Sequence, residues 1–167
     1  MQSLSTVNGF TYIDFAGQSI LENFFSWLFS RKIEGGTQLS LVQAWRFGAR
    51  YSIASYQNDV MRCLVDILHS NPVDPGAVRE AYWTMTCTPP QKIQSEELLK
   101  MLRQAFVVQV AYQASKRSEH KLEKDTYARS ILHTVAEFQE DLTYAVCIGF
   151  YDEDPDMPGV QLDKHLV

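Results

Sequence analysis

The residues that could carry metal or acid–base chemistry are few and widely spaced. The four histidines are His69, His120, His133 and His165, and none has a cysteine, histidine or acidic partner at a convincing metal-ligand spacing. His133 and Glu137 stand four residues apart, but that spacing is more typical of a pair on a helix surface than of a metal site or a catalytic dyad. We therefore predict no metal site and no cofactor.

The three cysteines offer little more chemistry. Cys87 precedes two prolines in a predicted loop and is the one candidate for a reactive thiol, but no histidine lies near it in sequence to act as its base. Cys63 and Cys147 suit small core positions. The sequence contains no glycine-rich phosphate loop, G-x-S-x-G elbow or H-E-x-x-H motif. It therefore predicts no catalytic residues and a protein that is not an enzyme.

Charge and composition narrow the possible partners and the compartment. The chain has 15 basic and 20 acidic residues, and its basic cluster at 116–124 is interleaved with acids, which is typical of a solvated helix end. No apolar run is long enough to span a bilayer, and the N-terminus lacks the basic and apolar regions of a signal peptide. The sparse cysteines indicate a reducing compartment. We expect no nucleic-acid partner, no membrane association and an intracellular location in the cytoplasm or nucleus.

The spacing of apolar residues predicts a mainly α chain with at most one or two short strands. A strand is expected at Thr11–Phe15, although its partner strand is not evident. Asp74–Pro75 and Ser95 are typical helix starts, and Asn71–Pro72 is a typical helix end. Helices are expected at about 19–32, 37–50, 53–70, 75–85, 95–114 and 126–149, with a charged linker or exposed helix at 115–125.

The apolar stripes of these helices predict the core. Leu64, Leu102 and Phe106 fall on such stripes and should be buried. Gly48 suits a close contact between two helices, because it has no side chain to hold them apart. Short loops between the helices make antiparallel neighbours the expected arrangement.

The segment from Tyr12 to Val65 resembles the second half of a BTB/POZ domain. Tyr12–Phe15 matches the strand and turn of that fold, and Ile20–Ile33 matches the helix with its aromatic-rich end. Trp45–Tyr51 stands in the turn of the following helical hairpin, and Tyr56–Met61 resembles the helix after it.

The downstream segments resemble the helical extension of many BTB-like proteins of filamentous fungi. The matching pieces are 75–82, Thr88–Pro90, Leu98–Tyr112 and Phe138–Leu142. Their shared order and spacing carry the resemblance, which covers about residues 11–145.

We predict four parts in the chain, two of them from the resemblance and the two termini from their composition. These are a disordered N-terminus at 1–10, a truncated BTB/POZ-like helical region at 11–70, the helical extension at 71–149 and an acidic disordered tail at 150–167. Only ten residues precede Thr11, so the first strands and helices of a complete BTB fold are expected to be missing. The acidic pattern with which many BTB proteins engage cullin-3 is also absent from residues 5–9, so cullin-3 binding is not expected.

The resemblance implies a non-enzymatic protein–protein interaction module, a scaffold or adaptor that binds a protein partner or a second copy of itself. A small-ligand binder or enzyme built in a helical bundle is the rival interpretation, and it requires polar residues that converge on an internal pocket. The third interpretation is a degenerate, truncated BTB remnant. For the tryptophans, core packing is the alternative to an interface role. The candidate interaction surface comprises Phe15, Phe24, Phe25, Trp27, Trp45 and Trp83.

Overall fold

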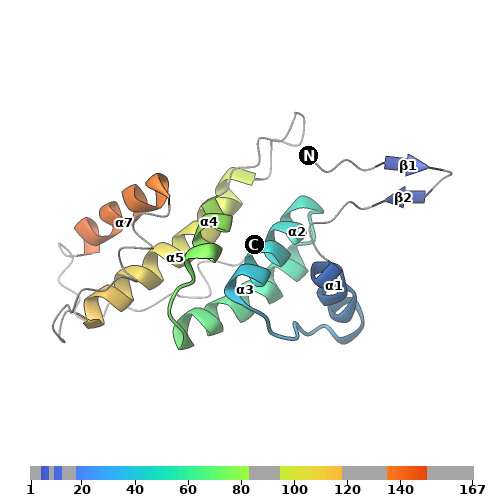
Figure 1. Cartoon of the computed structure of the whole chain (residues 1–167), viewed down its shortest axis with the longest axis horizontal. Coiled ribbons are helices and arrows are strands. Elements are labelled where there is room, and N and C mark those ends of the chain that lie inside the picture. Colours follow the sequence, from blue (N-terminus) through green and yellow to red (C-terminus); the bar gives the residue numbers. More distant parts are fainter. Residues whose placement is uncertain (1–4, 8–9, 13–17, 83–94, 118–134, 150–167) are drawn as a thin grey trace.

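The computed structural model describes residues 5–7, 10–12, 18–82, 95–117 and 135–149. Its described part is mainly helical, which confirms the predicted fold class. Figure 1 shows a body of packed helices from which a small hairpin projects. The elements are β1 (Ser5–Val7), β2 (Phe10–Tyr12), α1 (Gln18–Ser30), α2 (Gln38–Arg50), α3 (Ala54–Ser70), α4 (Pro75–Tyr82), α5 (Ser95–Arg117) and α7 (Ala136–Gly149).

Polar side chains set the starts of α2 and α4. The Thr37 hydroxyl accepts a hydrogen bond from the backbone N–H of Ser40 at 3.1 Å, which satisfies a donor that the first turn of α2 leaves free. The Asp74 carboxylate accepts one from the N–H of Gly76 at 2.9 Å, and Pro75 occupies the first position of α4. The predicted start at Asp74–Pro75 is confirmed.

The contact between α2 and α3 is close enough to require a glycine. A Cβ atom added to Gly48 would lie 2.6 Å from Cγ of Gln57 and 3.2 Å from Cδ1 of Tyr56. The short segment 51–53 joins the two helices and returns the chain along α2. The predicted role of Gly48 in a close helix contact is therefore confirmed.

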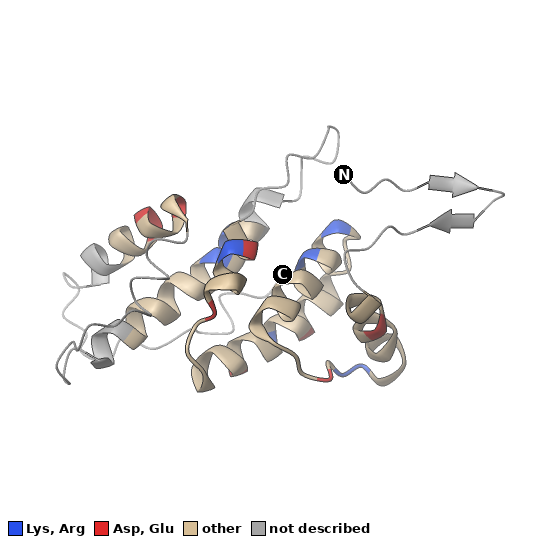
Figure 2. Ribbon diagram, viewed as in Figure 1, with Lys and Arg blue, Asp and Glu red and all other residues tan. Residues whose placement is uncertain are grey.

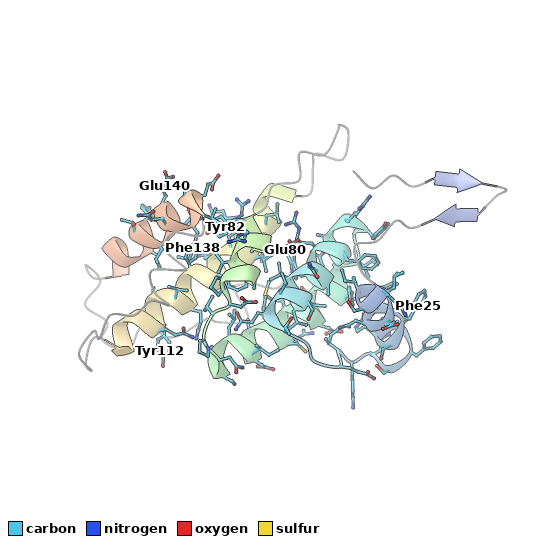
Figure 3. All side chains as sticks on the ribbon, viewed as in Figure 1. Phe25, Glu80, Tyr82, Tyr112, Phe138 and Glu140 are labelled. Carbon is cyan, nitrogen blue, oxygen red and sulfur yellow. The ribbon has the colours of Figure 1, made fainter. Side chains whose placement is uncertain are left out.

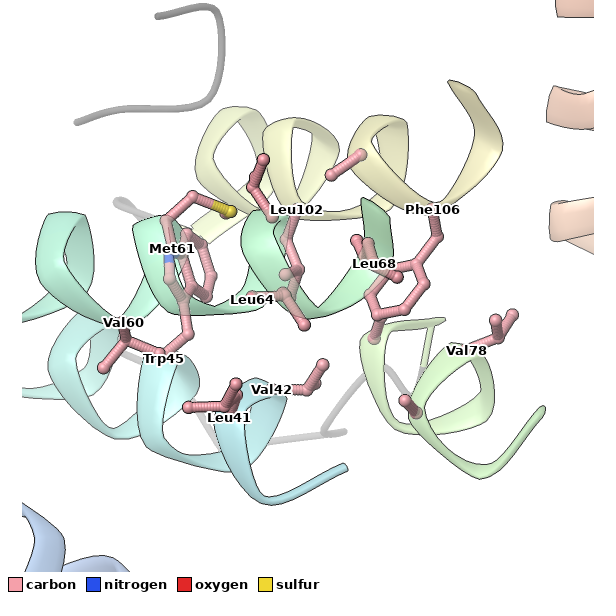
Figure 4. Close-up of a cluster of buried hydrophobic side chains, with 14 of the residues drawn as sticks. Leu41, Val42, Trp45, Val60, Met61, Leu64, Leu68, Val78, Leu102 and Phe106 are labelled. Carbon is pink, nitrogen blue, oxygen red and sulfur yellow. The ribbon is translucent and has the colours of Figure 1, made fainter. Parts of the chain in front are cut away.

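The hydrophobic core lies between α2, α3, α4 and α5, as Figure 4 shows. The predicted core residues Leu64, Leu102 and Phe106 are fully buried in it. α7 adds Phe138 and Leu142 to the same core. Figure 4 labels Leu41, Val42, Trp45, Val60, Met61, Leu64, Leu68, Val78, Leu102 and Phe106.

Buried glutamines fasten the loop between α3 and α4. The amide of Gln38 donates to the Pro72 carbonyl at 2.7 Å and accepts from the N–H of Asp74 at 2.7 Å. The amide of Gln109 on α5 donates to the Leu68 carbonyl at 2.8 Å. These bonds satisfy backbone groups that the end of α3 and the following loop leave without partners.

Within the N-terminal segment that was predicted to be disordered, the described residues belong to a hairpin. Ser5–Val7 pairs with Phe10–Tyr12 in an antiparallel hairpin, with Thr6 opposite Thr11. The sequence between the strands is Asn8–Gly9, and Asn-Gly is the strongest short-range signal for a two-residue hairpin loop. The strand expected at 11–15 begins at Phe10, and its residues after Tyr12 lie outside the described ranges.

The last two helices also differ from their predicted bounds. α5 continues to Arg117, so the charged segment begins as helix, and the cations at 116–117 suit a helix C-terminus. α7 begins at Ala136, and the earlier part of the helix expected from Thr126 lies outside the described residues. The same is true of the predicted tail at 150–167.

Candidate interaction surface on helix α1

Helix α1 carries apolar side chains on both of its sides. Ile20 and Trp27 face the core and are buried. On the opposite side Phe25 is 53% exposed, Leu28 41% and Phe29 89%. Residues three and four apart are neighbours on one helix face, so these three side chains form a continuous surface. We name Glu22, Phe25, Leu28 and Phe29 the outer face of α1, and Figure 3 shows Phe25 at the edge of the molecule.

An aromatic cluster holds the inner side of α1 against α2 and α3. The Phe24 ring lies 5.0 Å from that of Phe47 and 5.2 Å from that of Tyr56, measured between centroids, and both pairs are edge-on. The Trp27 ring lies 5.0 Å from that of Tyr56. Such pairs favour a defined geometry beyond the area that they bury. They therefore fix the rotation of α1 and point its outer face away from the core.

Polar contacts complete the anchor at Trp27. Its indole N–H donates to the Asp59 carboxylate of α3 at 2.8 Å. Arg62 forms an ion pair with the same carboxylate. The Arg31 guanidinium lies over the Trp27 ring, 4.6 Å from its centroid, in a cation–π arrangement. Trp27 thus joins α1 to α3 through both its ring and its N–H.

Two of the predicted surface residues are wrong for that role. Trp27 is 2% exposed and Trp45 is fully buried, so neither can meet a partner. The physical reason differs between them. Trp27 is the anchor of α1, whereas Trp45 lies in the central core of Figure 4. The alternative interpretation, core packing, holds for both.

The other predicted surface residues divide into three groups. Phe25 lies on the outer face and is exposed. Phe24 is half-buried and stacks on Trp27 with its centroid 5.9 Å away, so it belongs mainly to the anchor. Phe15 and Trp83 lie outside the described residues.

Leu28 and Phe29 are the surface residues that sequence reasoning missed. The signal was present, because Phe25 and Phe29 repeat at four residues on the side opposite Phe24 and Trp27. A surface helix normally has one apolar stripe. A second stripe on the same 13-residue helix therefore indicates a second packing partner.

Charges of opposite sign stand at the two ends of the outer face. Glu22 lies one turn before Phe25 and accepts a hydrogen bond from the Gln18 amide at 2.6 Å. Arg31 and Lys32 follow the end of the helix, and both are exposed. Figure 2 shows acidic colour on α1 and basic colour on the segment after it.

A second polar cluster joins α4, α5 and α7. The Tyr82 hydroxyl donates to the Asp141 carboxylate at 2.6 Å, and the Arg103 guanidinium lies 4.7 Å from the centroid of the Tyr82 ring. The Phe138 ring meets Tyr82 edge-on at 5.5 Å, and both are labelled in Figure 3. Burial and the bond to Asp141 raise the pKa of Tyr82, so its phenol stays protonated. This arrangement suits a structural contact between helices better than a catalytic base.

The described residues offer little for catalysis or metal binding. Burial raises the pKa of the Cys63 thiol, and the carboxylates of Asp66 and Asp59 raise it further, which disfavours the nucleophilic thiolate. Among the residues that the structure describes, no three histidines, cysteines or carboxylates are grouped as metal ligands would be. Cys87 lies outside the described residues. In the described part of the chain, no helix combines the length and apolar character needed to cross a membrane.

No family model, curated protein or solved structure matches this chain. The resemblance to BTB/POZ domains therefore stays a prediction that rests on the sequence segments quoted above.

Proposed function

We propose that this chain is a non-enzymatic protein-interaction module, a BTB-like intracellular scaffold that binds a protein partner or a second copy through the outer face of α1. The observation that carries the proposal is the exposure of Phe29, at 89%, beside the half-exposed Phe25 on a helix whose other side is anchored. The proposed partners do not include nucleic acid or a membrane.

Much of the apolar surface of the outer face is exposed to water in the free chain. Full burial of one phenylalanine or leucine side chain contributes about 1.5–3 kcal/mol. Phe25, Leu28 and Phe29 leave much of that stabilisation unrealised in the free chain. Contiguous apolar patches on protein surfaces often mark interaction sites. Recognition of one helix face through residues at three- and four-residue spacing is a common mode of peptide and helix binding.

The anchor makes the outer face ready for binding. The Trp27–Asp59 hydrogen bond and the rings of Phe47 and Tyr56 hold α1 in place before any partner arrives. Binding then loses little free energy to ordering of the helix, since preorganisation removes that part of the cost of association. A rigid helix with an exposed apolar face is therefore suited to binding.

The rival function, a ligand binder or enzyme within the helices, needs polar side chains that converge on a pocket. The buried amides of Gln38 and Gln109 instead bind backbone groups of the α3–α4 region. A shallow hollow on α7 is lined by Ala136, Gln139, Glu140, Thr143 and Tyr144, which all come from one helix. These observations favour the interaction module. If the chain is instead a degenerate BTB remnant, substitutions on the outer face should not change its association with other proteins or with itself.

The test compares tagged wild-type chain with Phe25→Asp and Phe29→Asp variants as bait in lysate of its native cells. Tyr144→Asp is the matched control, because Tyr144 is a 70% exposed aromatic on α7, away from α1. We expect both α1 variants to lose bound protein, whether foreign or a second copy, by about tenfold or more, and the control to retain it. Equal recovery by all four baits, with unchanged melting temperatures, would refute the proposal.

A further inference from the structure

We infer that the occupant of the outer face is a second copy of this chain, with the two α1 helices antiparallel about a two-fold axis. The inference rests on the proposed function and specifies its partner. A two-fold interface uses the same patch on both copies, so the patch must complement itself. The outer face of α1 complements itself only when the two helices run antiparallel.

The apolar positions fit an antiparallel pair. In such a pair, positions equally distant from a common midpoint face each other. Phe25 and Phe29 are equally distant from position 27, so each Phe25 would face Phe29 of the other copy. This arrangement gives two phenylalanine pairs related by the axis, and aromatic pairs add stability beyond their buried area.

The charged positions select the same register. Glu22 and Lys32 are also equally distant from position 27 in sequence, and Lys32 follows the end of α1 at Ser30, so the register that pairs the phenylalanines brings each glutamate toward the basic end of the other copy's α1. Neither residue forms an ion pair with another described residue. A parallel pair would instead place glutamate beside glutamate and lysine beside lysine, and like charges repel. Charge therefore favours the antiparallel direction.

The size of the surface indicates a weak dimer. A helix of 13 residues is about 20 Å long, given a rise of about 1.5 Å per residue. One face of such a helix is smaller than the roughly 800 Å² per partner of a standard interface. We therefore expect a concentration-dependent dimer of the transient class, visible at tens of micromolar. The glutamate within the face, together with the net charge of -5, disfavours an anionic membrane as the occupant.

The decisive experiment exchanges the charges between copies. Glu22→Lys and Lys32→Glu are prepared as separate chains, and each is measured alone and in an equimolar mixture by sedimentation velocity. Each variant alone places like charges together and should dimerise about tenfold more weakly than wild type. In the mixture both contacts become attractive, so dimer should return to near the wild-type level. A mixture that dimerises no better than its components overturns the antiparallel register.

A second comparison separates this inference from the proposed function. Wild-type chain and Phe29→Asp are measured by sedimentation and as baits for capture, with Tyr144→Asp as control. If the wild-type chain stays monomeric at hundreds of micromolar but captures another protein through Phe29, the occupant of the outer face is not a second copy. The proposed interaction module would then still hold. A monomer with no Phe29-dependent capture refutes both. If the chain forms no dimer but sediments with neutral or anionic lipid vesicles, and Phe29→Asp does not, the inference of a second copy is also refuted.

Discussion

Replacing Gly48 by alanine sets helix propensity against packing. Alanine is favoured over glycine inside a helix by about 1 kcal/mol. The new methyl group, however, would lie 2.6 Å from Cγ of Gln57 and 3.4 Å from its backbone nitrogen. Overpacking of this kind costs about 1–3 kcal/mol. Gln57 is 1% exposed and cannot swing into solvent, so α2 and α3 must separate and packing should win.

We therefore expect Gly48→Ala to lower the free energy of unfolding by about 1–2 kcal/mol, because a contact this short at a buried site belongs to the upper part of the packing range, about 2–3 kcal/mol, and the propensity gain offsets about 1 kcal/mol of it. For a chain of this size that loss is about 2–8 °C in melting temperature, and thermal denaturation followed by circular dichroism measures it. Gln57→Ala removes the main clash, so Gly48→Ala should cost less in that background, as a double-mutant cycle would show. A single variant as stable as wild type would refute the close α2–α3 contact.

Three further predictions concern single side chains. Leu102→Ala should cost about 2–5 kcal/mol because it opens a cavity at a fully buried site, and an unchanged melting curve would mean that the rotation of α5 is wrong. Trp27→Phe removes the bond to Asp59 and should cost about 1 kcal/mol or more in urea unfolding, whereas no loss would contradict the anchor. Burial raises the pKa of Tyr56 from 10.0 to about 12. Its raised pKa stabilises the fold below pH 10, and that stability should fall as pH rises from 10 to 12. Tyr56→Phe should flatten this fall, and a variant with the same alkaline slope as wild type would refute the assignment.

Local signals were enough to predict most of the helical framework. The apolar periodicity of α3 and α5 identified Leu64, Leu102 and Phe106, because a helix with one apolar stripe has only one side to bury. Asp74 and Pro75 marked the start of α4 through capping chemistry that acts within a few residues. Such signals need no knowledge of distant contacts.

The hairpin was missed although its turn signal is local. Each strand has only three residues, too few for apolar alternation to stand out from the background. Asn8–Gly9 was the informative dipeptide, and it predicts a hairpin more strongly than the strands around it.

The candidate surface could be predicted only in part, because α1 is apolar on both sides. Periodicity identifies a helix but does not decide which of two apolar stripes meets the core. That choice depends on Asp59, which is 32 residues from Trp27 in sequence and accepts its N–H. Phe25 was one of the six predicted surface residues, whereas the exposure of Phe29 follows from this long-range contact. The Gln38 and Gln109 bonds are long-range in the same way.

The most direct test of the central claim is the mass of the purified chain in solution as a function of concentration, with wild type and Phe29→Asp compared by light scattering. We expect the wild-type mass to rise above the 19.1 kDa of one chain at tens of micromolar, and Phe29→Asp to stay at that mass with an unchanged melting temperature. A wild-type mass of one chain at every concentration, joined to protein capture that does not depend on Phe29, would contradict it.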